Sequence, residues 1–174
     1  MLSGFIIIAL PPIAVLSALV YLPYLLYSNR RYGKQKFSYH FVKYTFIGYC
    51  ISLVFLTILW QLPISTFPPE HYFLNLRPFV WMYEVYDMGV KKMTQQLLLN
   101  IGMFVPYGLL LPMAVKKMRS LRKVVLTILC STVTIETMQY FLGRSADIDD
   151  VIMNLTGGLL GYLFYTILAR RTEK

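Results

Sequence analysis

Charged residues are scarce in this chain. Asp, Glu, Lys and Arg make up 14% of its 174 residues, against about 25% in a typical soluble domain. Among the charged residues the acidic ones are the fewer, with 8 Asp and Glu against 17 Lys and Arg. Charge is missing in blocks, which leaves long apolar runs, and 57% of the residues are hydrophobic. This combination excludes an ordinary soluble domain and is typical of several membrane-spanning helices.

Residues that commonly bind metals or cofactors are also few. Cys50 and Cys130 lie inside apolar runs without C-x-x-C spacing, so we expect them to pack as small hydrophobic side chains. His40 and His71 have no second ligand at metal-binding spacing. The chain contains neither G-x-G-x-x-G nor G-x-x-x-x-G-K-S/T, the loops that hold nucleotide phosphates. The sequence therefore predicts no metal and no cofactor.

The hydropathy pattern predicts an all-α fold, a polytopic bundle of five transmembrane helices in one domain over residues 1–174. A run of about 20 residues crosses the hydrocarbon core at about 1.5 Å per residue. The predicted spans are residues 4–27, 41–62, 95–115, 124–142 and 150–169. Between the second and third spans, the aromatic stretch Leu76 to Tyr83 is predicted to lie at the interface as a short helix or a re-entrant piece.

Basic residues predict the orientation of the chain. With five spans, 13 of the 17 Lys and Arg residues fall on one side of the membrane, and Arg77, Lys91, Lys92 and Arg144 fall on the other. Cytoplasmic segments are enriched in Lys and Arg, so the N-terminus is predicted to be outside and the C-terminus in the cytoplasm. Because the basic residues flank apolar runs, membrane lipids rather than nucleic acid are the expected partners of the net charge of +9.

Polar side chains inside the predicted spans are the strongest indication of function, because a polar group in lipid is costly unless it is paired. Glu136 and Gln139 share one face of the fourth span, and Asp150 and Asn154 share one face of the fifth. Asn100 lies near the outer end of the third. Counting from the helix ends places Glu136 roughly 10 Å, and Asn100 and Asn154 roughly 6–8 Å, below the outer ends of their helices. We therefore expect a polar site near the outer membrane surface.

The deep carboxylate of Glu136 needs a partner or a shifted pKa. Arg144 is its nearest candidate partner in the sequence, followed by Arg77. Among the small residues of the fifth span, Gly157 and Gly161 form a G-x-x-x-G pattern, which favours close approach of a second helix.

Three further carboxylates, those of Asp147, Asp149 and Asp150, lie in or beside the turn before the fifth span. Asp149 or Asp150 is expected to cap the helix that follows, where a carboxylate also suits the helix dipole. The three could alternatively hold Ca²⁺ or Mg²⁺, but they follow no recognised calcium-loop pattern.

Several of these residues form a combined motif. It consists of Asn100-Ile101-Gly102-Met103-Phe104-Val105-Pro106-Tyr107-Gly108, Glu136-x-x-Gln139 and Arg144-x-x-Asp147-x-x-Asp150-x-x-x-Asn154-x-x-Gly157-x-x-x-Gly161. With Leu76-Arg77-Pro78-Phe79 upstream, it resembles the VanZ-like family over about residues 75–165. That family is named for a membrane protein linked to resistance to the glycopeptide antibiotic teicoplanin. The resemblance implies a multi-pass protein of the bacterial cell membrane with a shared site at Asn100, Glu136, Gln139, Arg144, Asp150 and Asn154.

Two functions fit these residues. In the first, the site binds a lipid or a lipid-linked cell-envelope precursor, and arginine guanidinium groups form hydrogen bonds with its phosphate or carboxylate. The ligand-binding residues of this hypothesis are Arg77, Asn100, Gln139, Arg144, Asp147 and Asn154. In the second, the protein is a membrane enzyme in which Glu136 and Asp150 act as acid and base on a lipid-linked substrate. The second lacks an evident nucleophile, because Ser145 has no accompanying His.

Overall fold

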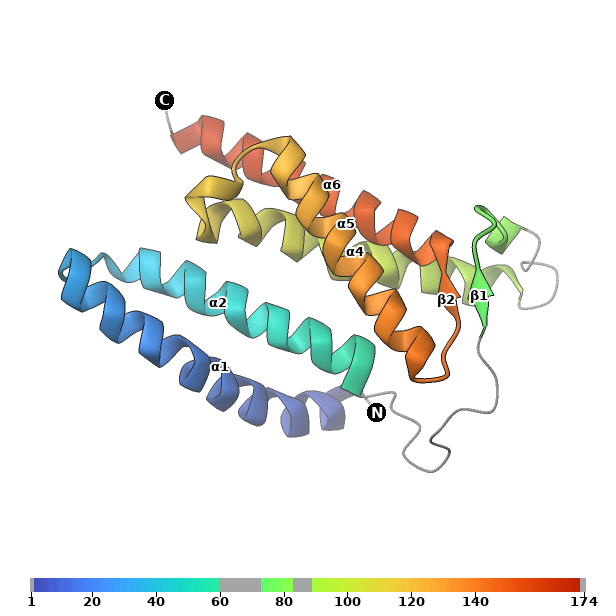
Figure 1. Cartoon of the computed structure of the whole chain (residues 1–174), viewed down its shortest axis with the longest axis horizontal. Helices are drawn as coiled ribbons and strands as arrows, with labels where there is room; N and C mark the ends of the chain where they lie inside the picture. The colour runs from blue at the N-terminus through green and yellow to red at the C-terminus, as the bar shows by residue number, and fades with distance from the viewer. Residues whose placement is uncertain (1, 60–72, 83–88, 173–174) are drawn as a thin grey trace.

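The computed structural model describes residues 2–59, 73–82 and 89–172. It contains five helices that are long and apolar enough to cross a membrane (Figure 1), which confirms the predicted helical membrane bundle. They are α1 (Leu2–Tyr32), α2 (Phe37–Val54), α4 (Val90–Ala114), α5 (Leu121–Phe141) and α6 (Ile148–Thr172). A π-helix, η1 (Phe55–Leu59), extends α2, and a 3-10 helix, η2 (Lys116–Met118), lies between α4 and α5.

The helices extend beyond the predicted spans at several ends. Hydropathy marks only the apolar part of a helix, whereas backbone hydrogen bonding continues into the flanking polar residues. Thus α1 continues through Arg30 and Arg31, and α6 through Arg170 and Arg171, where cations suit the negative end of the helix dipole. Prolines lie inside α1 and α4 without ending either helix, as membrane helices tolerate.

The tightest packing joins α4 and α6. A Cβ atom at Gly157 would lie 2.1 Å from the carbonyl oxygen of Ile101, and one at Gly161 would lie 2.0 Å from that of Val105. Only hydrogen side chains allow these backbones to approach so closely. The predicted G-x-x-x-G pattern therefore marks a real helix contact, and it brings the polar residues of α4 and α6 together.

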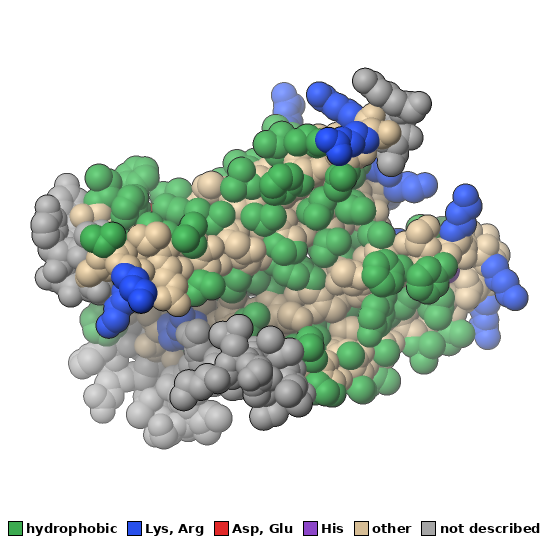
Figure 2. All heavy atoms as spheres, turned by 180° about the vertical axis from the view of Figure 1, so that it is seen from behind, with side chains coloured by type: hydrophobic (Ala, Val, Ile, Leu, Met, Phe, Trp, Pro, Cys, Tyr) green, Lys and Arg blue, Asp and Glu red, His purple; other side chains and the backbone are tan. Residues whose placement is uncertain are grey.

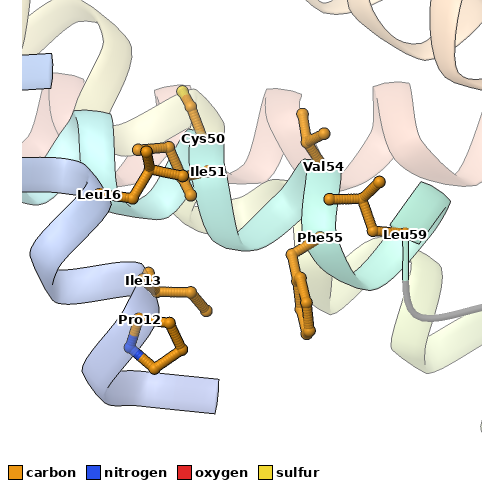
Figure 3. Close-up of a pocket in the computed structure, with 8 residues that line it drawn as sticks. All are labelled: Pro12, Ile13, Leu16, Cys50, Ile51, Val54, Phe55 and Leu59. Atoms are coloured by element: carbon orange, nitrogen blue, oxygen red, sulfur yellow. The ribbon is translucent and has the colours of Figure 1, made fainter.

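The α1–α2 hairpin lies at the edge of the bundle, where α2 packs against α4 (Figure 1). A cavity of about 350 Å³ separates parts of α1 and α2, and Figure 3 shows its side chains. They are the apolar side chains of Pro12, Ile13, Leu16, Cys50, Ile51, Val54, Phe55 and Leu59. Among the described residues that line this cavity none is charged, and the Cys50 thiol is at most a weak hydrogen-bond donor.

The two groups of basic residues lie at opposite ends of the bundle. Figure 2 shows Lys and Arg side chains at these ends and a hydrophobic surface between them. Such a surface fits the hydrocarbon core of a bilayer. The end with Arg77, Lys91, Lys92 and Arg144 carries β1 and β2 (Figure 1). That this end faces outward remains a prediction.

Candidate functional site

A short parallel sheet lies at this end of the bundle. Its strands are β1 (Leu74–Asn75) and β2 (Ala146–Asp147), with Leu74 opposite Ala146 and Asn75 opposite Asp147. The Asn75 side chain strengthens the pairing, because its Nδ2 donates to Asp147 Oδ2 at 3.1 Å. Two segments 72 residues apart thus meet beside the turn between α5 and α6.

The segment after β1 is held by Asp149. Its Oδ1 accepts the backbone N–H of Phe79 at 2.6 Å, and its Oδ2 accepts that of Trp81 at 3.4 Å. Phe79 has a φ of 64°, which is uncommon for a residue other than glycine. The sequence predicted a short helix or re-entrant piece here. Within that stretch, residues 78–80 form a turn and Trp81 and Met82 are helical, while Tyr83 lies outside the described residues.

The cap of α6 differs from the prediction. The capping residue is Asp147, whose Oδ1 accepts the backbone N–H of Asp149 at 2.8 Å, as is usual for an N-cap side chain. The reason is that α6 begins at Ile148, two residues before the predicted span. Asp149 therefore lies within the first turn, and its carboxylate is directed to the segment after β1.

Glu136 is buried, with 7% of its surface exposed. Its Oε2 accepts the backbone N–H of Asp147 at 3.0 Å. The sequence predicted that Arg144 is the partner of Glu136. In the structure Arg144 instead donates to the carbonyl oxygen of Thr57, and no ion pair involving Glu136 occurs among the described residues. Burial lowers the pKa of the Arg144 guanidinium, whereas the nearby Glu136 and Asp150 act to raise this pKa. Because the unperturbed pKa of arginine is so high, Arg144 stays protonated.

The partner of Arg144 is a backbone carbonyl of η1. Thr57 O accepts a hydrogen bond from Arg144 Nη1 at 2.8 Å and another from Gln139 Nε2 at 2.9 Å. A π turn disrupts the regular helical hydrogen bonds and is frequent at functional sites. Here the carbonyl joins the end of α2 to α5 and to the following turn. Sequence reasoning missed Thr57, because every residue has a carbonyl and the sequence shows no sign of which one becomes available.

The remaining predicted residues join α6 to its neighbours. Asn100 of α4 donates its Nδ2 to Asp150 Oδ1. Asn154 donates its Nδ2 to Thr132 Oγ1 of α5 at 2.8 Å. Residues of three helices thus meet at one end of the bundle. Arg77 is the exception, since it is exposed and its bond to this network is made by its backbone N–H, which donates to Asn75 Oδ1 at 3.1 Å.

A cavity of about 310 Å³ opens beside Glu136. Two acidic residues, Glu136 and Asp147, line it together with a larger set of mostly apolar residues. That set comprises Leu74, Leu76, Val133, Thr137, Tyr140, Phe141, Ala146, Ile148 and Val151. The cavity therefore has two chemically different parts, one that can accept hydrogen bonds and one that can cover hydrocarbon. Asp150 does not line it.

The geometry gives no support to a metal centre in this region. Across residues 2–59, 73–82 and 89–172, no group of three or more His, Cys, Asp and Glu side chains is placed to hold a metal ion. Both oxygens of Asp147 and both of Asp149 already accept hydrogen bonds from N–H groups.

Comparison with known proteins agrees with the motif. Residues 41–169 match the VanZ/LLP1 family, and this stretch contains the whole polar network around Glu136. The chain is similar to Protein VanZ of Enterococcus faecium, with 32% identity over 121 residues, which cover 67% of this chain and 68% of that protein. No solved structure matches the chain. The chain therefore belongs to the VanZ/LLP1 family, and its five apolar helices make it a multi-pass protein of the bacterial membrane.

Proposed function

We propose that the protein binds a membrane lipid or a lipid-linked cell-envelope precursor in the cavity beside Glu136. The observation that carries this proposal is the lining, in which two acidic residues adjoin a mostly apolar wall. A ligand that fits both parts has a polar head joined to a hydrocarbon portion. The described lining of the α1–α2 cavity contains no charged side chain, so it offers no comparable group for recognising a head group.

The size of the cavity supports the same ligand class. Its volume of about 310 Å³ lies at the lower end of small-molecule pockets, which span about 300–1,000 Å³. It can take the head end of a lipid and the first part of a chain. The rest of the chain then lies in the surrounding bilayer, along the hydrophobic surface of Figure 2.

The predicted orientation places the cavity at the outer leaflet, because its end of the bundle carries few basic residues. Glycopeptide antibiotics bind the exposed ends of cell-wall precursors. Binding or shielding such a lipid-linked molecule would contribute to teicoplanin resistance. The support for this last step is membership in the family that includes Protein VanZ.

A binding function is better supported than the enzyme alternative. Glu136 lines the cavity, whereas Asp150 does not and is held by Asn100 of α4. An acid and a base that act on one substrate must both reach it. Both oxygens of Asp147 already accept N–H groups, so Asp147 does not replace Asp150 as the second group.

The test is native mass spectrometry of protein extracted gently with its own lipids. The Glu136→Gln variant removes the charge but keeps an oxygen that can accept the Asp147 N–H. The matched control is Thr134→Ala, which changes an exposed residue of α5 that lines a different cavity. We expect wild type and control to carry one specific lipid that Glu136→Gln loses. The same average membrane lipids on all three proteins would overturn the proposal, and a lipid retained but chemically unprocessed in Glu136→Gln would favour the enzyme.

A further inference from the structure

A second polar cluster lies between α1 and α2, at the end of the bundle opposite to β1 and β2 (Figure 1). The Lys43 amine donates a hydrogen bond to the Tyr24 hydroxyl, which lies 2.7 Å from the hydroxyl of Tyr39. The amine also lies over both aromatic rings, 4.2 Å from the centroid of Tyr24 and 4.6 Å from that of Tyr39. An ammonium has three N–H donors. The two phenol hydroxyls take at most two of them, which leaves at least one for another acceptor.

The positive charge of this hairpin has no counter-charge. Residues 1–69 contain no Asp or Glu, whereas residues 30–43 contain five Lys and Arg. Four of these five side chains are exposed, and the fifth, Lys43, is half-buried. No ion pair with Lys43 occurs among the described residues. A partly desolvated ammonium whose partners are all uncharged favours an anion as a further partner.

The apolar cavity between α1 and α2 lies along the same face of α2 as Lys43. Lys43, Cys50 and Val54 follow one another at intervals of seven and four residues, which keep side chains on one face of a helix. Cys50 and Val54 line the cavity, and Figure 3 shows the side chains that α1 contributes to it. At about 1.5 Å per residue, the cavity begins about 10 Å along the helix from Lys43.

This cavity is open to the medium around the bundle. Two of its lining residues, Leu16 and Leu59, are 48% and 51% exposed. Both belong to helices that are apolar enough to span a membrane, so this medium is the hydrocarbon of the bilayer. The chains of one leaflet fill about 15 Å, half of a hydrocarbon core of about 30 Å. A lipid chain whose head group lies level with Lys43 therefore reaches the cavity.

We propose that the α1–α2 hairpin binds a phospholipid, with the phosphate at Lys43 and the hydroxyls of Tyr24 and Tyr39, and with one acyl chain in the apolar cavity. This site is separate from the cavity beside Glu136 and does not depend on the function proposed for that cavity. The predicted orientation assigns it to the cytoplasmic leaflet. The four exposed Lys and Arg side chains of the hairpin attract anionic phospholipids most strongly.

The first test measures lipid binding to delipidated protein in a neutral maltoside detergent by native mass spectrometry. The probes are phosphatidylglycerol and diacylglycerol with identical acyl chains, which differ in the phosphate head group. Lys43→Met removes the ammonium but keeps a long apolar side chain. The matched control is Lys34→Met, which removes the same charge from an exposed position. Both variants keep the cavity beside Glu136, so lipid bound there contributes equally.

We expect wild type and Lys34→Met to bind phosphatidylglycerol at least about tenfold more tightly than diacylglycerol, because hydrogen bonds to a charged group have this order of effect. Lys43→Met should lose most of this preference. A lysine that only extends its ammonium to water predicts instead that the two lysine variants behave alike.

The second test locates the acyl chain by photo-crosslinking. Phosphatidylglycerol that carries a diazirine in one acyl chain is bound to wild-type protein and irradiated, and the modified residues are identified by mass spectrometry. We expect the modifications to concentrate on residues that line the cavity, such as Ile13 of α1 and Ile51 of α2. Lys43→Met should reduce these modifications, and Lys34→Met should not.

Four outcomes would overturn the proposal. Equal binding of the two lipids by wild type removes the role of the phosphate, and this comparison does not depend on the folding of a variant. An equal loss of affinity in both lysine variants indicates attraction by net charge alone. Modifications spread evenly over the apolar surface contradict the position of the acyl chain. Stabilisation by inorganic phosphate that equals stabilisation by phosphatidylglycerol indicates a free anion as the ligand.

Discussion

The contact between α4 and α6 makes a strong prediction for the Gly157→Ala variant. A Cβ at this position would lie 2.1 Å from the Ile101 carbonyl oxygen, about 1.3 Å short of the 3.4 Å at which ordinary contact begins. The atom that it meets belongs to a helix backbone, so no side-chain rotation relieves the clash. The two helices must separate, which would also stretch the bond from Asn100 to Asp150.

The destabilisation caused by Gly157→Ala is best measured against the Gly102→Ala variant, because a Cβ at Gly102 would meet nothing within 4 Å. Both variants gain the same helix preference of alanine over glycine, about 1 kcal/mol, so this contribution cancels in their difference. The overpacking cost that remains is about 1–3 kcal/mol. In a protein of this size, where 1 kcal/mol shifts the melting temperature by about 2–4 °C, Gly157→Ala should melt roughly 2–12 °C below Gly102→Ala.

The assay is thermal unfolding of both variants and wild type in one detergent, followed by circular dichroism. Gly102→Ala should melt at or slightly above wild type. If the two alanine variants melt at the same temperature, the backbones of α4 and α6 are not in direct contact, and the geometry of the polar site loses its support.

Two further predictions concern the turn after α5 and the orientation of the chain. Gln139→Leu and Arg144→Leu should each lower the free energy of unfolding by about 0.5–1.5 kcal/mol. The double variant should lower it by about 1–3 kcal/mol more than the sum of the single variants, because the Thr57 carbonyl of η1 then loses both donors. Strictly additive effects, measured by denaturant unfolding, would refute the shared acceptor. In a cysteine-free background, Ser145→Cys should react with a membrane-impermeant maleimide on intact cells, whereas Ser120→Cys at the other end of the bundle should react only after lysis. Both positions are exposed, and the reverse labelling pattern would refute the predicted orientation.

The sequence by itself determined the number of apolar helices and the contact face of α6. Hydropathy and helical periodicity are local properties, so apolar runs of sufficient length identify spans wherever the chain places them. The G-x-x-x-G pattern of Gly157 and Gly161 was also sufficient to predict a close helix contact. Depth counting predicted a similar level for Asn100, Glu136 and Asn154, because the rise per residue of a helix is fixed.

Only the tertiary structure decided which partner each polar group has. Glu136 bonds the Asp147 amide, and Arg144 bonds the carbonyl of Thr57. Both partners are backbone groups, which every residue carries and which no sequence pattern distinguishes. The pairing of β1 with β2 and the cavity that it helps to line depend on segments 72 residues apart. Their meeting is set by the path of the chain through three dimensions, and local propensity contains no information about that path.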